Sequence, residues 1–205
     1  MYDNVKAFLR LDSMQDALAD NDLEYVYTMW KRQGGNPKFL SAFLLQRNIM
    51  PLDYMTYVPE ESFKGISISI IDLSDKNIEQ IGAQAFEENY TLYNLNLGKV
   101  KYIGVAAFSG CTSLQKLNIP SQLDSIDEDA FSYCDLQELH IPKTVRRIGL
   151  KAFSHNNSLN KVTTEHTVED FKNVCCGDKA LDYVFFNCNY LDEVICSDGT
   201  ISIHH

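Results

Sequence analysis

The chain has no apolar stretch long enough to cross a membrane. Its longest apolar run, Ile66 to Ile71, is interrupted by serines, whereas a membrane-spanning helix needs about 20 predominantly apolar residues. The N-terminus contains Asp3, Lys6 and Arg10, so it lacks the unbroken apolar segment of a secretory signal. We therefore expect a cytoplasmic protein, unless a leader was removed from the chain.

Positive charge is also scarce. The 205 residues include 28 acidic and 18 basic side chains, for a net charge of −10. Binding to a nucleic-acid backbone needs clustered Lys and Arg, which release counterions, so this balance disfavours nucleic acid as a ligand. Residues 58–205 hold 21 acids and 12 bases and account for −9 of the total.

No sequence motif for catalysis is present. The chain contains no G-x-S-x-G, phosphate-binding Gly-rich loop, H-E-x-x-H or EF-hand pattern. Glu60-Glu61 and Asp127–Asp129 could in principle supply paired carboxylates, but solvated loop charge is the simpler interpretation of both. The sequence therefore predicts that the protein is not an enzyme.

What the chain does contain is a repeat marked by phenylalanine. The repeated residues are Phe63, Phe86, Phe108, Phe131, Phe153 and Phe185. Their intervals are 23, 22, 23, 22 and 32 residues. In the first five units a β-branched residue precedes the Phe by five positions, and apolar residues follow it at about six, nine and eleven positions. This periodicity indicates a stack of similar coils.

The unit of Phe108 illustrates the physical reason for these offsets. Alternation along a strand sends Leu117 and Ile119 to the core side. Lys116 and Asn118 then face the solvent. Since a Phe cannot be buried within one coil of this length, each ring is expected to stack on its counterpart in the next coil.

A glycine lies four residues before the Phe in several units, at Gly82, Gly104 and Gly149. We expect a positive φ or a close backbone approach at this position. Asp127 takes the same position in the fourth unit, and Asp also tolerates a positive φ.

The segment from Ile103 to Pro120, "IGVAAFSGCTSLQKLNIP", contains the whole pattern. The consensus I-G-x-x-A-F-x-x-C-x-x-L-x-x-L-x-I-P resembles the BspA-type leucine-rich repeat, which is common in bacterial surface proteins and also occurs in phage-encoded proteins. The resemblance covers about Val58 to Cys196. It implies an α/β solenoid in which each coil supplies one short parallel strand.

The sequence departs from this pattern in places. Asn89, Asn156 and Ile66 occupy the Cys position of the consensus. Thr164 replaces the last apolar residue of the fifth unit. The fifth interval is ten residues too long, and we assign the excess to an insertion near residues 165–181.

Residues 1–57 are predicted to form a helical cap on the first coil of a repeat domain that spans residues 58–205. Three helices are expected from capping residues and from Gly or Pro stops: one from Asp12 or Ser13 to Ala19, one from Asn21 or Asp22 to Gln33, and one from Asn36-Pro37 to about Arg47.

The other end is predicted to be closed by a β-hairpin. Asp198-Gly199 lies between two strand-like runs, which is a strong short-range hairpin signal. We expect residues 200–203 to fold back antiparallel and to cover the sheet edge. His204 and His205 are compatible with the start of an expression tag and are assigned no role.

The six cysteines are expected to be free thiols in a reducing cytoplasm. Cys111, Cys134 and Cys188 each follow a repeat Phe by three residues, so we expect them to form a buried column. Cys175-Cys176, near His166, is the only cluster that suggests a metal, but its spacing fits no zinc-binding pair. No metal or cofactor is predicted.

The outward positions of the strands form the candidate binding surface, because solenoids use such extended faces to bind partners. For any single residue, solubility alone is the competing explanation. The predicted protein-binding residues are Asn94, Asn96, Lys116, Asn118, Glu138, His140, Lys161, Thr163 and Glu193.

These observations predict a non-enzymatic protein-protein interaction module whose partner is another protein. The resemblance implies a finer role, since small BspA-like chains without a signal or anchor look like phage or mobile-element products: an inhibitor of a host enzyme or defence protein. Two alternatives stay open. One is an acidic decoy that occupies a nucleic-acid-binding site, and the other is a fragment of a bacterial surface adhesin.

Overall fold

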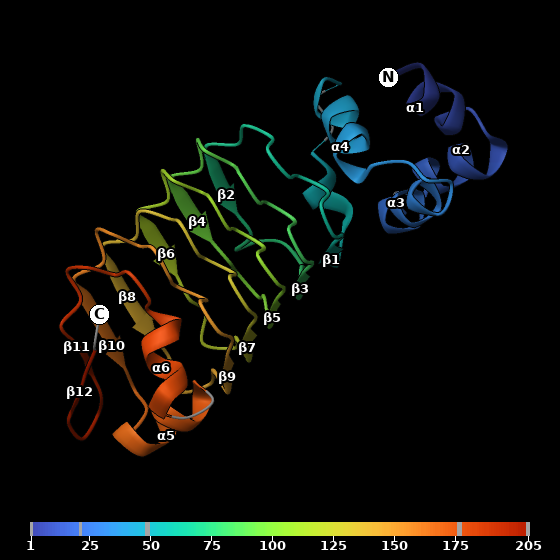
Figure 1. The fold of residues 1–205 in the computed structure, drawn as a ribbon. Helices are drawn as coiled ribbons and strands as arrows, with labels where there is room; N and C mark the ends of the chain where they lie inside the picture. The colour runs from blue at the N-terminus through green and yellow to red at the C-terminus, as the bar shows by residue number, and fades with distance from the viewer. Residues whose placement is uncertain (1, 21, 48–49, 176–177, 204–205) are drawn as a thin grey trace.

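The computed structural model describes residues 2–20, 22–47, 50–175 and 178–203. A helical unit at the N-terminus is followed by a solenoid of stacked coils, with the C-terminus at the far end (Figure 1). None of the described helices is both long and apolar enough to cross a membrane. His204 and His205 lie outside the described residues.

Four helices make up the N-terminal unit: α1 (Tyr2–Leu9), α2 (Asp12–Ala19), α3 (Leu23–Arg32) and α4 (Pro37–Leu45). The side chain of Asp22 accepts a hydrogen bond from the Tyr25 backbone N–H at 3.0 Å, and Asn36 caps α4 in the same way. Asn21, the other predicted cap of α3, lies outside the described residues. The N-cap of α2 is Leu11 instead of a polar residue.

The described residues form two hydrophobic cores. One lies among the four N-terminal helices and the other runs through the whole solenoid. The short 3₁₀ helix η1 (Pro51–Tyr54) connects them, because Leu52 belongs to the solenoid core and Met55 to the helical one. The division between residues 57 and 58 stays a prediction, since this connecting segment takes part in both cores.

Each of the first five coils contributes to a parallel sheet that the sequence did not predict. Its strands have two residues each. The first residue of each pair is exposed or half-buried, and the second is buried. The strands, in spatial order, are β1 (Tyr57–Val58), β3 (Gln80–Ile81), β5 (Tyr102–Ile103), β7 (Ser125–Ile126) and β9 (Arg147–Ile148). The β-branched residues of the repeat are the buried members of this sheet.

The predicted strands lie on another side of the solenoid (Figure 1). They are divided into a three-stranded sheet of β2 (Ile70–Asp72), β4 (Asn94–Asn96) and β6 (Lys116–Asn118), and a four-stranded sheet of β8 (Glu138–Ile141), β10 (Lys161–Thr164), β11 (Glu193–Ile195) and β12 (Thr200–Ser202). β12 pairs antiparallel with β11. The C-terminal hairpin is therefore confirmed, and it covers the end of the sheet.

The phenylalanine column is confirmed. All six rings are fully buried, at 0% exposure. Neighbouring rings stack with centroids 5.1–5.8 Å apart and interplanar angles of 2–13°. Each coil therefore buries its ring against the adjacent coil, as the spacing predicts.

A second internal column supplies hydrogen-bond donors. Cys134 Sγ lies 3.3 Å from the carbonyl oxygen of Phe108 in the preceding coil, and Cys111 and Cys188 make the equivalent contact. Where the repeat has Asn156, its amide nitrogen donates to the carbonyl oxygens of both Phe131 and Phe153 at 2.9 Å. Asn is thus a functional substitute for Cys at this position, since both satisfy a buried backbone carbonyl.

The glycines before the phenylalanines have a different role from a positive φ. A Cβ atom at Gly104 would lie 2.8 Å from the backbone nitrogen of Ala83 in the preceding coil, and Gly82 and Gly149 are equally crowded. None of the three has a positive φ, and neither does Asp127. The suggestion that Asp127 is tolerated for its positive φ is therefore wrong, whereas the close backbone approach is confirmed.

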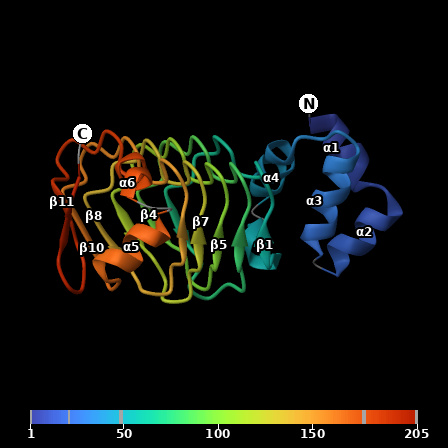
Figure 2. The ribbon, with the colours of Figure 1, turned by 60° about the horizontal axis from the view of Figure 1, so that its bottom comes forward.

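The insertion near residues 165–181 is helical in the structure. It contains α5 (Val168–Val174) and the start of α6 (Asp178–Val184), which lie at the C-terminal end of the stack (Figure 2). Phe171 and Val184 are fully buried in the solenoid core. The segment therefore packs against the solenoid core as part of the final coil.

Candidate functional site

An open groove of about 590 Å³ crosses strands β4, β6, β8 and β10. We call it the sheet groove. Among the residues that line it are seven of the nine predicted contact residues: Asn94, Lys116, Asn118, Glu138, His140, Lys161 and Thr163. The remaining two, Asn96 and Glu193, lie on β4 and β11 but do not line the groove.

Strand alternation explains the make-up of the sheet groove. Leu117 and Leu139 point inward and are 7% and 2% exposed, so they lie beneath the groove. The residues on either side of each Leu point outward and are polar. The groove therefore presents polar side chains above a largely covered apolar layer.

The sheet is interrupted in the middle of the groove. β4 pairs with β6 and β8 pairs with β10, but the described residues show no ladder between β6 and β8. Leu117 follows its Phe by nine residues and Leu139 follows its Phe by eight. The same one-residue difference separates β2 from β4 and β8 from β10, whose ladders are intact, so spacing alone does not explain the interruption. The rings of Phe108 and Phe131 keep their 5.2 Å separation across it.

The interruption matters for binding because backbone groups need hydrogen-bond partners. Within the described chain, the edges of β6 and β8 that face each other make no ladder hydrogen bonds. Water or a bound partner can satisfy such groups.

Charge alternates across the groove. Lys161 lies opposite Glu138 in the β8–β10 register, and its Nζ is 3.9 Å from the carboxylate. Lys116 occupies the equivalent outward position on β6, beyond the interruption. Because all three side chains are exposed, the pattern is accessible to a partner and contributes little to folding stability.

His140 is more firmly held than the sequence suggests. Its Nδ1 lies 2.9 Å from Thr163 Oγ1, and its Nε2 lies 3.8 Å from Glu165 Oε1. Its Nδ1 therefore has a hydrogen-bond partner on the neighbouring coil, whereas the contact with Glu165 is an ion pair only when the ring is protonated. His140 stays exposed and accessible to a partner.

The acidic groups considered for catalysis serve as ion-pair partners. Glu60 pairs with Lys31 of α3, and Asp127 Oδ1 lies 3.0 Å from Arg147 Nη2. The two groups belong to different coils and do not share a site. Glu60 is about half exposed, as expected for solvated charge, whereas Asp127 is partly buried beside Arg147.

The cluster considered for metal binding is also accounted for by packing. His166 is 4% exposed, and its ring nitrogens contact Thr164 Oγ1 at 2.7 Å and the carbonyl oxygen of Val145 at 2.9 Å. Cys175 is buried, and Cys176 lies outside the described residues. Among the residues that the structure describes, no three His, Cys, Asp or Glu side chains are grouped to hold a metal.

Burial also controls the chemistry of the cysteine column. It raises the pKa of the Cys111 and Cys188 thiols to about 12, and it raises the pKa of Cys134 well above the ordinary value. The thiolate is the nucleophilic form of cysteine. These three side chains are therefore protonated core residues at neutral pH.

One surface cluster was not predicted. Tyr133 and His155 stack with ring centroids 4.1 Å apart, and Phe186 meets His155 edge-on at 5.7 Å. Asn187 also lies 3.3 Å from His155 Nδ1. The repeat offset could have revealed this cluster, since Tyr133, His155 and Asn187 each follow a column Phe by two residues.

Comparison with known proteins identifies the family. The model of the BspA type leucine-rich repeat region matches residues 41–99 and 79–186, in six copies. This match covers more than half of the chain. The chain therefore belongs to the BspA-type leucine-rich repeat family, which confirms the resemblance seen in its repeats.

Two solved structures are similar to the chain. A leucine-rich repeat protein from Bacteroides ovatus is 29% identical with a TM-score of 0.56, and the match covers 69% of this chain and 35% of that one. The pneumococcal vaccine antigen PcpA is 30% identical with a TM-score of 0.51, and the match covers 55% and 29%. The chain thus spans about a third of the length of these proteins. No curated protein matches it.

Proposed function

We propose that this chain is a non-enzymatic module that binds another protein through the sheet groove. The observation that carries the proposal is the coincidence of the groove with seven of the nine outward residues singled out in the sequence. Leucine-rich repeat proteins are typically protein-interaction modules or surface proteins, and extended solenoid faces suit this use.

The chemistry of the groove favours a polar and exchangeable interface. Its lining combines amides, two lysines and a glutamate, whereas permanent interfaces are more apolar at their centre. A partner segment with complementary charges would meet Lys116 and Lys161 on either side of Glu138. The alternation gives specificity, because like charges in contact are costly.

The experiment uses the full chain as bait in a host-cell lysate, followed by identification of the captured protein. We expect Lys116→Glu with Lys161→Glu to abolish capture while circular dichroism stays unchanged. The control is Lys99→Glu with Lys143→Glu, which makes the same change in charge at exposed lysines outside the groove. The proposal would be contradicted if both double variants kept the captured protein equally well, or if both lost it equally.

The helical insertion provides a second arm of the same experiment. Deleting it would remove Phe171 from the core, so a surface variant is the better probe. Glu169→Lys with Asp170→Lys changes two exposed side chains of α5. If this variant loses the captured protein and the lysine reversal keeps it, recognition belongs to α5 and the sheet-groove proposal is wrong.

The acidic decoy has less support. Several acids of the repeat domain are engaged by basic neighbours, including Glu87 by Lys64 at 2.5 Å and Glu79 by Lys101 at 2.9 Å. A phosphate mimic needs uncompensated negative charge. Loss of the captured partner at ~0.5 M salt, where charges are screened within a few ångströms, would favour the decoy.

Two finer roles stay proposals. An inhibitor of a host enzyme or defence protein would capture one cytoplasmic protein and lower its activity, and the cytoplasmic location itself stays a prediction. A portion of a surface adhesin is compatible with the family and would instead bind to intact cells. Incubation of the labelled chain with a clarified lysate and with whole cells distinguishes the two.

A further inference from the structure

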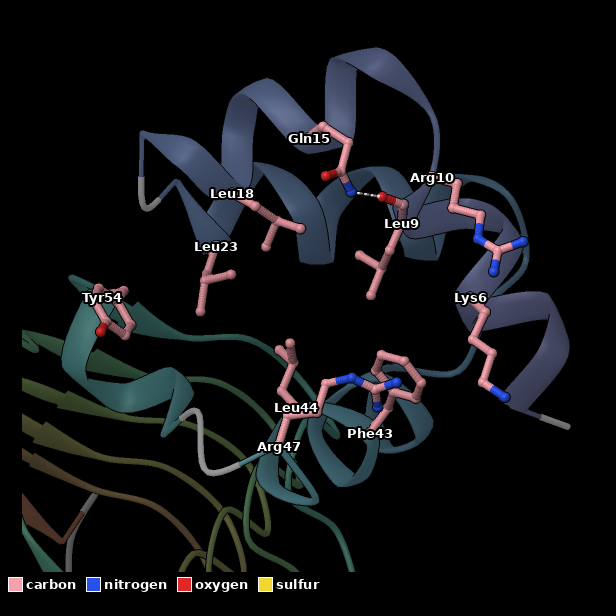
Figure 3. Close-up of a pocket in the computed structure, with 10 residues that line it drawn as sticks. All are labelled: Lys6, Leu9, Arg10, Gln15, Leu18, Leu23, Phe43, Leu44, Arg47 and Tyr54. Atoms are coloured by element: carbon pink, nitrogen blue, oxygen red, sulfur yellow. Dashed lines mark hydrogen bonds between the residues drawn. The ribbon is translucent and has the colours of Figure 1, made fainter.

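The N-terminal helical unit contains a pocket of about 530 Å³. It lies between α1, α2 and the start of α3 on one side and α4 and η1 on the other, and side chains from both sides point into it (Figure 3). Ligand sites in proteins are typically clefts of about 300–1,000 Å³. The pocket is therefore of a size that suits a small molecule.

The interior of this pocket is apolar. Leu9, Leu23, Phe43 and Leu44 are between 2% and 7% exposed, and all four line it. Leu18 adds a partly exposed apolar side chain near Leu23 (Figure 3). A surface of this kind favours an aliphatic or aromatic group over water.

The charged residues of the pocket are all basic. Lys6, Arg10 and Arg47 line it, and no described acidic residue does. Residues 1–57 contain six bases and seven acids in total, so half of the bases of this unit converge on one pocket. The basic lining of this pocket contrasts with the net charge of −9 in residues 58–205.

The nearby acids do not neutralise this end of the pocket. Asp3 lies 3.7 Å from Lys6, but its side chain is 93% exposed, so the pair is worth little. Glu24 turns toward the connecting segment, where it accepts hydrogen bonds from the Thr56 hydroxyl at 2.6 Å and the Tyr57 N–H at 3.2 Å. An anion that enters the pocket is therefore attracted.

The two ends of the pocket differ in chemistry. In Figure 3, Lys6, Arg10 and the guanidinium of Arg47 lie to one side, and Leu18 and Leu23 lie to the other. The Arg47 guanidinium is held 3.6 Å above the ring of Phe43, which positions a fork of N–H donors beside the apolar interior. The pocket is thus amphipathic along its length.

We propose that this pocket binds a small anionic amphiphile, namely a medium-chain alkyl carboxylate. The carboxylate accepts hydrogen bonds from Arg10 and Arg47, a geometry that guanidinium groups provide well, with Lys6 adding positive charge. The alkyl chain lies among Leu18, Leu23 and Leu44. The site belongs to the helical unit and is separate from the sheet groove, so its test is independent of the proposed function.

Isothermal titration calorimetry of the full chain with decanoate, below its micelle concentration, tests the site. Decanol and decyltrimethylammonium carry the same tail with no charge or with the opposite charge. We expect saturable binding of decanoate at least about tenfold tighter than that of either control, because a charge-assisted hydrogen bond contributes enough for such a factor. Equal or tighter binding of decyltrimethylammonium overturns the proposal.

Variants locate the binding. Arg10→Gln with Arg47→Gln is expected to weaken decanoate binding at least about tenfold, whereas the control Arg32→Gln with Arg146→Gln, which removes two arginines outside the pocket, stays within about twofold. If the double variant fails to fold, Arg10→Gln alone serves as the test variant, and a smaller loss of decanoate affinity is expected. Equal loss in pocket and control variants overturns the assignment.

A bilayer is the other source of an anionic amphiphile. Sedimentation with vesicles of an anionic phospholipid separates the two sources, since a single-ligand pocket predicts no co-sedimentation that depends on Arg10 and Arg47. Vesicle binding that requires these arginines, without saturable heat from decanoate, would overturn the proposal.

Discussion

The solenoid and the N-terminal helical unit bury their aromatic side chains in different ways. In the solenoid, Phe108 stacks on Phe86 and on Phe131 at the same 5.2 Å separation. In the helical unit, Phe8 meets Trp30 at 5.1 Å with the rings tilted by 56°. The first contact recurs in every coil, whereas the second is defined by one particular crossing of helices.

This difference determines how each region is stabilised. A solenoid gains its stability from each repeat and from the interfaces between neighbours, so one core position is used many times. The helical unit depends on contacts that each occur once, such as the buried hydrogen bond between Tyr27 and Ser41. Substitutions at equivalent depths should therefore have different consequences in the two regions.

The largest expected effect is that of Phe108→Ala. The ring contacts a neighbour on both faces, so we expect the free energy of unfolding to fall by about 3–5 kcal/mol, as measured by urea denaturation. Phe8→Ala removes a single aromatic contact, and a smaller loss is expected. A fully stable Phe108 variant would mean that stacking between coils does not hold the solenoid together.

Asn156→Ala should have the next largest effect. It leaves the carbonyl oxygen of Phe131 and the N–H of Leu136 without their side-chain partner, at about 1–3 kcal/mol for each buried group left unsatisfied, while the carbonyl oxygen of Phe153 keeps its contact with Cys188 Sγ. The matched variant Asn156→Cys restores a donor of the kind that Cys134 provides, so thermal denaturation should show a smaller loss. Equal losses for Ala and Cys would refute the proposed equivalence.

High pH should weaken the solenoid through its cysteines. Burial raises the pKa of Cys111 and Cys188 from 9.0 to about 12, so the unfolded chain releases these protons first. The stability they contribute is complete below pH 9 and is lost as the pH rises toward 12, by up to about 1.4 kcal/mol per pH unit for each thiol.

Urea titrations between pH 8 and 12 measure this effect, and Cys111→Ala should make the decline shallower. Residues 1–57 contain no cysteine. Burial raises the pKa of Tyr27 in this region as well, but the tyrosine affects stability only above pH ~10.

In native protein, thiol reagents should label Cys111 and Cys134 slowly. Rapid labelling of both would contradict the assigned repeat register.

Tyr27→Phe probes the helical unit. It removes the partner of Ser41, which is fully buried, and should lower the free energy of unfolding by about 1 kcal/mol. Adding Ser41→Ala should recover part of this loss, because replacing both partners leaves no unsatisfied hydroxyl. A double variant that shows the sum of two separate losses would argue against the hydrogen bond.

The smallest expected effect concerns the link between the two regions. Lys31 of α3 pairs with Glu60 of the first coil, and both side chains are about half exposed. Glu60→Gln should therefore cost less than about 1 kcal/mol, as measured by urea denaturation. A larger loss, with the helical unit unfolding separately, would show that this contact couples the two regions.

Much of the solenoid could be predicted because its signals are local and repeated. The Phe offsets predicted the stack, the three Cys positions predicted a buried column, and Asp198-Gly199 predicted the hairpin. The outward residues of the candidate site could be predicted for the same reason, since alternation along a strand depends only on sequence order. Whether they bind a partner stays a prediction.

The repeat period, the core positions and the sign of the charge follow from residue type and from spacing along the chain. Other features arise only when the coils and helices pack together. The second sheet, the break between β6 and β8 and the helical form of the insertion depend on how adjacent coils meet. The basic pocket depends on side chains from separate helices, from Lys6 to Arg47, and no spacing rule relates such residues before the helices pack.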